Sequence, residues 1–158
     1  MSKPYSPPHL SKVYEALTAI ADNRFELVSD TELKIYSSSR GKYYTVTYDP
    51  KTNQIMSNDN TAYYTHSVSY PMLALLMLRG DLKYDPTLLS PLSNIIWKDI
   101  MTKHKNDYDA GIVEVLSSLA KKGVDIASLQ SKIAAIYADA CKLTLSPLGK
   151  RLPPPKAY

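Results

Sequence analysis

The feature that most constrains the fold is Met72–Leu78, the longest unbroken apolar run in the chain. Met, Leu and Ala favour helices, and Ser69, Pro71 and Gly80 suit an N-cap, a first helical turn and a C-terminal stop. A helix that is apolar all round must be covered on several sides. Because a membrane span takes roughly 20 apolar residues, this run is too short to cross a bilayer. We therefore expect the core helix of a soluble domain.

The residues before this run change from a helical to an alternating pattern. Residues 9–22 predict an amphipathic helix whose polar face carries Lys12, Glu15 and Asp22. Residues 24–57 contain short stretches of alternating polar and apolar residues separated by turn residues. They predict a three- or four-strand antiparallel meander. The stretch 61–68 is compatible with either a strand or a loop.

The residues after the run are helical and then rich in proline. Ser90-Pro91 is typical of a helix start, and the apolar spacing predicts three helices in 91–143, with Asn106 or Asp107 and then Asp125 as caps. Residues 144–158 predict an extended, mobile tail. The fold class is therefore α+β, with a single domain over 1–143 in which 8–80 hold a helix, the sheet and the central helix, and 91–143 hold a helical array.

Charge separates the tail from the rest of the chain. The formal net charge is +4, and residues 142–158 alone hold four bases and no acid, so residues 1–141 are neutral overall. A basic tail can attract phosphates or an acidic partner, or it can serve solubility alone. Cys141 is the only cysteine, which excludes an intrachain disulfide and a cysteine-rich metal site. No secretory leader pattern is present, so we expect an intracellular, cytoplasmic protein.

The order of these elements resembles the SWIM-type zinc finger over residues 33–78. The matching words are Ile35–Ser39, Tyr43–Val46 and Met72–Leu76. That family places a Cys-x-Cys pair and a Cys-x-His pair before a short apolar helix. Its members are thought to bind DNA or proteins, which is what the resemblance implies for this chain.

The resemblance aligns residues other than the zinc ligands with the ligand positions. Ser57 and Asp59 stand at the first pair, and Ser69 and Pro71 stand at the second pair. Because serine and proline cannot replace thiolate and imidazole, the resemblance implies no zinc here. An apolar core would have to stabilise the fold in place of the metal. We expect no metal and no cofactor.

The leading hypothesis is a non-enzymatic binding module that contacts nucleic acid or a protein partner. Thirteen tyrosines are present, and several lie beside basic residues around the first hairpin loop. Bases of single-stranded nucleic acid stack on such rings, and basic groups attract the backbone. The candidate binding residues are Lys34, Arg40, Lys42, Tyr43, Tyr44, Lys150 and Arg151.

Two alternatives stay open. The apolar positions in 91–143, including Trp97, allow a structural protein that forms a homo-oligomer. A small hydrolase with Asp59, His66 and Ser69 is the other alternative, because serine, histidine and aspartate together can activate a nucleophile. No nucleophile elbow or glycine-rich phosphate loop accompanies these three residues.

Overall fold

A computed structural model describes residues 3–156 of the chain. The helices are α1 (Ser11–Ala21), α2 (Asn60–Thr65), α3 (Tyr70–Arg79), α4 (Trp97–Lys103), α5 (Tyr108–Lys121) and α6 (Ile126–Cys141), with a short 3-10 turn at Pro86–Leu88. The strands are β1 (Phe25–Ser29), β2 (Glu32–Tyr36), β3 (Tyr43–Asp49), β4 (Gln54–Ser57) and β5 (Ser146–Pro147). They form one sheet in the order β1-β2-β3-β4-β5. This mixed arrangement confirms the α+β class.

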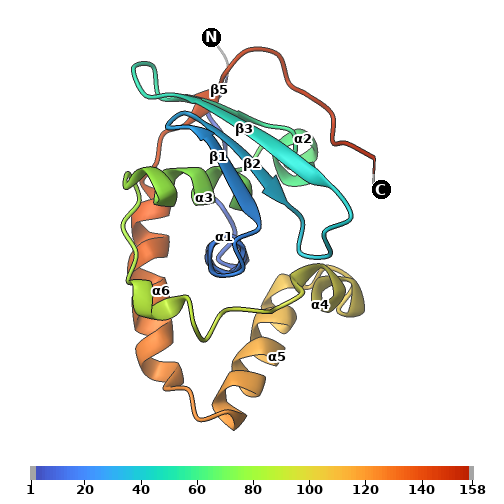
Figure 1. Ribbon diagram of the computed structural model, residues 1–158, viewed down its shortest axis with the longest axis vertical. Coiled ribbons are helices and arrows are strands. Elements are labelled where there is room, and N and C mark those ends of the chain that lie inside the picture. Colours follow the sequence, from blue (N-terminus) through green and yellow to red (C-terminus); the bar gives the residue numbers. More distant parts are fainter. Residues whose placement is uncertain (1–2, 157–158) are drawn as a thin grey trace.

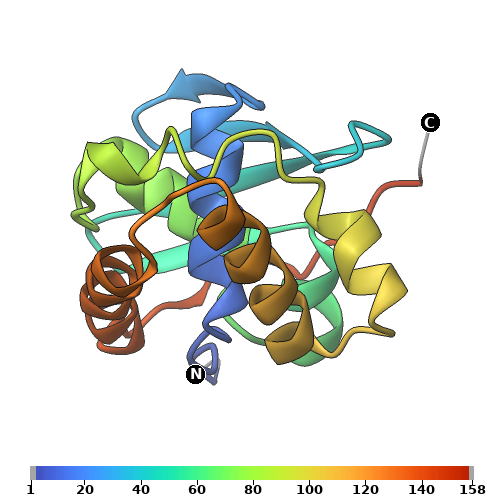
Figure 2. The ribbon, with the colours of Figure 1, turned by 90° about the horizontal axis from the view of Figure 1, so that it is seen from below.

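The helices cover one face of the sheet. Figure 1 shows the sheet at the top, α3 directly beneath it, and α1 end-on in the centre. Helix α6 lies to the left of α1, α5 lies below it and to the right, and α4 lies below the hairpin loop between β2 and β3. Turned by 90°, α1 runs through the middle of the molecule behind α5 (Figure 2). The core therefore lies between the inner face of the sheet and the C-terminal helices.

Helix α3 confirms the prediction made from the apolar run. Residues Pro71 to Met77 are buried, and Gly80 ends the helix with φ of 88°, a conformation that suits glycine. Ser69 occupies the N-cap position, but its side chain makes no capping bond to the helix. Its hydroxyl donates instead to Asp59, at 2.6 Å. Within residues 3–156 no helix has the length and apolar character needed to pass through a membrane.

Helix α1 is more deeply buried than its pattern predicts. Lys12, predicted on a solvent-facing side, is only 7% exposed, and Glu15 is partly buried. The prediction was wrong for Lys12 because α1 is enclosed by α3 on one side and by α5 and α6 on another (Figure 2). The lysine is tolerated there because the Glu15 carboxylate lies 3.2 Å away.

The antiparallel meander has four strands, as the sequence allowed. On β3, Tyr44 and Val46 point into the core while Thr47 is exposed, which confirms the predicted alternation. The fifth strand was not predicted. Residues 146 and 147 of the expected mobile tail pair in parallel with β4, and Leu145 is fully buried. Residues 157 and 158 of that tail lie outside the described residues.

Two further segments differ from the sequence predictions. Part of the ambiguous stretch 61–68 is helix α2, which begins because the Asp59 carboxylate accepts a bond from the backbone N–H of Ala62 at 2.9 Å. The helix predicted to start at Ser90-Pro91 starts only at Trp97. Asn94 adopts a left-handed conformation with φ of 61°, which interrupts any helix from residue 91. The Asp107 and Asp125 caps are confirmed.

Candidate functional site

The sheet separates the predicted binding residues onto two faces. Lys34 lies on β2 between the buried Leu33 and Ile35, so its side chain points away from the core. Its Nζ lies 4.1 Å from the ring centre of Tyr43 and 5.8 Å from that of Tyr36. The rings of Tyr36 and Tyr43 are 5.8 Å apart and tilted. We call Lys34, Tyr36 and Tyr43 the outer tyrosine face.

Lys42 and Tyr44 lie on the opposite, inner side of the same hairpin. Tyr44 is 6% exposed, and the Lys42 Nζ lies 5.5 Å from its ring centre. Arg40 sits in the loop between the strands, where its φ is 58° and its guanidinium donates to the carbonyl of Asp22 at 3.5 Å. The structure therefore does not bring Lys34, Arg40 and Lys42 together in one patch.

The two basic tail residues follow β5, and Arg151 lies against α2. The Arg151 guanidinium donates to the Tyr63 carbonyl at 3.0 Å and stacks 4.7 Å from the Tyr63 ring centre. Lys150 is exposed. Arg151 therefore holds the described part of the tail against α2.

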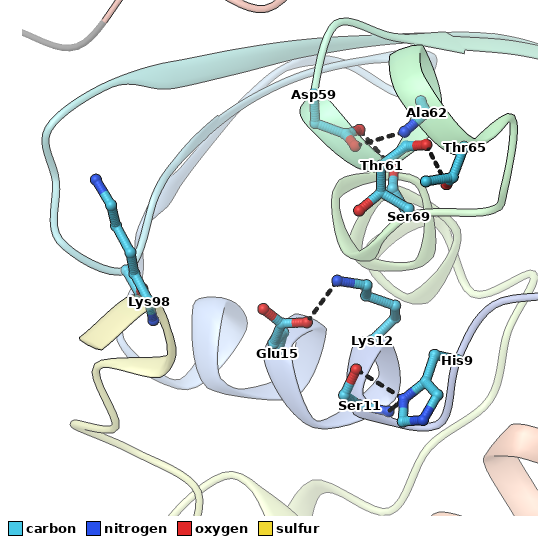
Figure 3. Close-up of polar contacts among 11 residues, drawn as sticks. His9, Ser11, Lys12, Glu15, Asp59, Thr61, Ala62, Thr65, Ser69 and Lys98 are labelled. Atoms are coloured by element: carbon cyan, nitrogen blue, oxygen red, sulfur yellow. Dashed lines mark hydrogen bonds and ion pairs between the residues drawn. The ribbon is translucent and has the colours of Figure 1, made fainter. Parts of the chain in front are cut away.

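The inner side of the hairpin opens into a cavity of about 290 Å³ between β3, α1, α2 and α4. We call it the lysine pocket. Its lining combines three lysines and two carboxylates with tyrosines and hydroxyl side chains, among them Lys12, Lys42, Lys98, Glu15, Asp59 and Tyr44. Figure 3 shows Asp59 and Thr61 above this space, Lys12 and Glu15 below it, and Lys98 at its side.

The floor of the lysine pocket is an ion pair on α1. Burial alone would lower the pKa of Lys12, but the Glu15 carboxylate and the nearby Tyr108 outweigh it, so the pKa is raised. The ammonium group also lies 4.6 Å from the Tyr108 ring centre. Lys12 is therefore held in its charged form.

The rim of the pocket carries two further lysines. Partial burial, together with the positive charge of Lys98, lowers the pKa of Lys42. Among residues 3–156, neither lysine has a carboxylate within ion-pair distance. Burial and the carboxylates of Asp59 and Glu15 raise the pKa of Tyr44, so its phenol remains a hydrogen-bond donor at neutral pH.

Asp59 is the centre of a buried hydrogen-bond network. One carboxylate oxygen accepts from the Ala62 N–H, and the other accepts from the hydroxyls of Ser57 and Ser69. The sequence resemblance placed zinc-ligand positions at these three residues, Ser57, Asp59 and Ser69. In this chain the three side chains meet through hydrogen bonds.

His66, the third member of the possible hydrolase site, points elsewhere. Its Nε2 lies 2.7 Å from the carbonyl of Lys3, and its ring centre lies 4.7 Å from that of Tyr5. Asp59 and Ser69 are thus brought together, while the printed contacts of His66 are with the N-terminal segment. Its φ of 50° lets it end α2 in a left-handed conformation.

Sequence reasoning missed a second serine–histidine–aspartate contact. His9 Nδ1 lies 3.0 Å from the Ser11 hydroxyl, and Nε2 lies 3.2 Å from Asp109. Nδ1 also accepts the backbone N–H of Ser11, so His9 begins α1 in the manner of a cap. Ser11 is completely buried, so its hydroxyl is out of reach of a substrate. The 100 residues between His9 and Asp109 left no local signal for this contact.

The described residues contain no group of three or more His, Cys, Asp or Glu side chains placed to hold a metal ion. A scan of protein families matches residues 5–146 to the family described as Uncharacterised conserved protein UCP014422. The chain belongs to this family. No curated protein and no solved structure matches it. The matched range includes the outer tyrosine face and the lysine pocket, and it ends before Lys150 and Arg151.

Proposed function

We propose that this protein is a non-enzymatic binding module and that its outer tyrosine face contacts single-stranded nucleic acid. The observation that carries the proposal is the lysine held 4.1 Å above the Tyr43 ring, with Tyr36 beside it. Aromatic rings on a sheet provide stacking surfaces for unpaired bases, and an adjacent cation attracts the backbone phosphates. The exposed Lys150 adds non-specific attraction.

The test is fluorescence anisotropy with single-stranded RNA, single-stranded DNA and duplex DNA at low and physiological salt. Replacing Tyr36 and Tyr43 together by alanine should weaken single-strand binding at least about tenfold, since stacking contributes roughly 1–3 kcal/mol per base. Tyr64→Ala is the matched control, because Tyr64 is an exposed tyrosine on α2 and not part of the outer tyrosine face. Unchanged single-strand binding in the double variant would contradict the proposal.

A truncated chain tests whether nucleic acid binds to the tail or to the outer tyrosine face. Ending the chain at Gly149 removes Lys150 and Arg151 but keeps β5, which a cut at residue 142 would destroy. We expect the truncated protein to keep its preference for single strands and to show a weaker salt dependence. Loss of all binding on truncation would assign the binding to the tail instead.

A second candidate function is assembly into a homo-oligomer, and one observation favours it. Strand β1 is an edge strand, and its Leu27 and Val28 are 44% and 56% exposed. An exposed apolar edge can pair with the same strand of another copy. Trp97, by contrast, is buried and donates to the Thr18 hydroxyl at 2.9 Å, so it is not available to a partner.

Sedimentation velocity tests this second candidate. The wild type should sediment as a dimer at high concentration, and Val28→Lys should shift it to monomer. Thr47→Lys on the exposed side of β3 is the control for added charge. A monomeric wild type at every concentration would reject the assembly role.

A further inference from the structure

The lysine pocket lies on the other side of the sheet from the outer tyrosine face. Its walls come from β3, α1, α2 and α4, which are distant in the sequence (Figure 3). Its volume of about 290 Å³ is near the lower end for small-molecule sites. The cavity therefore suits a small ligand and not the continuous backbone of a polymer.

The charges in the pocket are not balanced within the protein. Lys12 is neutralised by Glu15, and Asp59 keeps its negative charge while it accepts hydrogen bonds from Ser57, Ser69 and Ala62. The three lysines and two carboxylates of the lining therefore leave one positive charge unbalanced. Lys42 and Lys98 line the same cavity without an ion-pair partner in the described part of the chain. Two like charges that share a partly enclosed space repel each other unless an anion lies between or beside them.

The uncharged lining supplies oxygen-binding donors. Ser38 and Thr61 bring hydroxyls to the cavity, and the Tyr44 phenol is a further donor. The Thr102 hydroxyl, which also lines the cavity, already donates to the Lys98 carbonyl at 2.7 Å. Lysines together with hydroxyls are typical partners of phosphate oxygens. A phosphate monoester offers three acceptor oxygens, enough to meet both lysines and the neighbouring hydroxyls, whereas a carboxylate offers only two.

Glu15 closes the floor of the pocket. Its Oε2 is buried and lies 3.2 Å from the Lys12 ammonium, so this ion pair is complete without a ligand. The groups left to meet a ligand are therefore the two lysines without ion-pair partners and the hydroxyl lining. From these groups we infer that the lysine pocket binds a small phosphate monoester.

Isothermal titration calorimetry with the full chain tests this inference. The probes are ribose 5-phosphate, ribose, inorganic phosphate and malate. Ribose 5-phosphate should bind most tightly, and ribose should not bind. Lys42→Met and Lys98→Met should each weaken ribose 5-phosphate binding about tenfold or more, the expected effect of losing a charged hydrogen bond. Lys51→Met, which removes an exposed lysine far from the pocket, should leave it unchanged.

A further arm makes the outcome decisive. A 5′-phosphorylated oligonucleotide tests whether the phosphate comes from a nucleic-acid end. The inference is overturned if ribose 5-phosphate fails to bind, if Lys42→Met leaves its affinity unchanged, or if only the oligonucleotide binds through these lysines. Lys34→Met, on the outer tyrosine face, should leave ribose 5-phosphate binding unchanged. The failure of this inference can therefore be told apart from the failure of the nucleic-acid proposal.

Discussion

The two faces of the β2–β3 hairpin place the same residue types in different surroundings. Tyr43 and Tyr44 are adjacent in the sequence, yet Tyr43 stacks under Lys34 on the outside and Tyr44 lines the lysine pocket with Lys42. The period of two residues along a strand sends neighbouring side chains to opposite faces. A basic and tyrosine-rich segment is therefore not one patch but two surfaces with different depth and charge balance.

The largest effect is expected from replacing Asp59, whose carboxylate lines the lysine pocket on the inner face. Asp59→Ala takes away the α2 cap and leaves the buried hydroxyls of Ser57 and Ser69 without their acceptor. We expect the free energy of unfolding to fall by about 3 kcal/mol in urea titrations. Asp107→Ala removes an exposed cap of α5 and should cost only about 1 kcal/mol. Equal losses in both variants would show that the Asp59 network adds nothing beyond a cap.

A second test compares adjacent positions on β3. Val46 is completely buried and Thr47 is exposed. Val46→Ala should lower the free energy of unfolding by about 2 kcal/mol because it opens a cavity against α3. Thr47→Ala should change it by less than about 0.5 kcal/mol, as is usual at the surface. If Thr47→Ala lowered the free energy of unfolding as much as Val46→Ala does, Thr47 would have to be covered by another copy of the chain, which would contradict an exposed outer face.

A third test uses alkaline pH. Burial and the neighbouring carboxylates raise the pKa of Tyr44 above its ordinary value of 10.0. The folded state then binds this proton more tightly than the unfolded state does, so the stability it contributes is complete below pH 10 and is lost as pH rises above 10. The slope is about 1.4 kcal/mol per pH unit for one group. Tyr44→Phe should lack this contribution, which urea titrations from pH 9 to 11 will measure. Parallel loss of stability in the variant and the wild type would contradict the assignment.

The smallest test contrasts the two lysines of the hairpin. Lys34→Met loses the cation–π contact with Tyr43 and should destabilise the protein by about 0.5 kcal/mol. Lys42→Met removes a partly buried charge close to Lys98 and should leave stability unchanged or raise it slightly. Residues kept at a cost to stability are typical of binding sites. Differential scanning calorimetry on both variants measures whether each substitution raises or lowers stability. A clear destabilisation by Lys42→Met would argue against an unbalanced positive charge in the lysine pocket.

Local patterns in the sequence were sufficient for much of the fold. The helix at Met72–Leu78, the meander and the caps at Asp107 and Asp125 each depend on a few neighbouring residues, and the structure confirms them. The burial of Lys12 was missed because the spacing of apolar residues shows only which face of a helix is apolar. It does not show how many other elements pack around that helix. Strand β5 was missed because a two-residue strand in a proline-rich segment has no pattern of its own.

The candidate site was less predictable because its parts come from distant segments. Lys12, Lys42 and Lys98 lie on three different elements, and no spacing between them signals that they line one cavity. The start of α2 was accessible in principle, since an aspartate directly before Asn60-Thr61-Ala62 is a recognisable cap. Whether a given tyrosine faces the outside or the pocket depends on its place in the alternation along the strand, and grouping Tyr43 with Tyr44 as one set of binding residues overlooked this.

The measurement that tests the central claim most directly is a crossed titration of two single variants. Lys34→Met and Lys42→Met are each titrated with single-stranded RNA and with ribose 5-phosphate, and the four affinities are compared with those of the wild type. The two-face account predicts that Lys34→Met weakens RNA binding alone and that Lys42→Met weakens ribose 5-phosphate binding alone. Loss of both ligands in either variant, or of neither ligand in both, would contradict it.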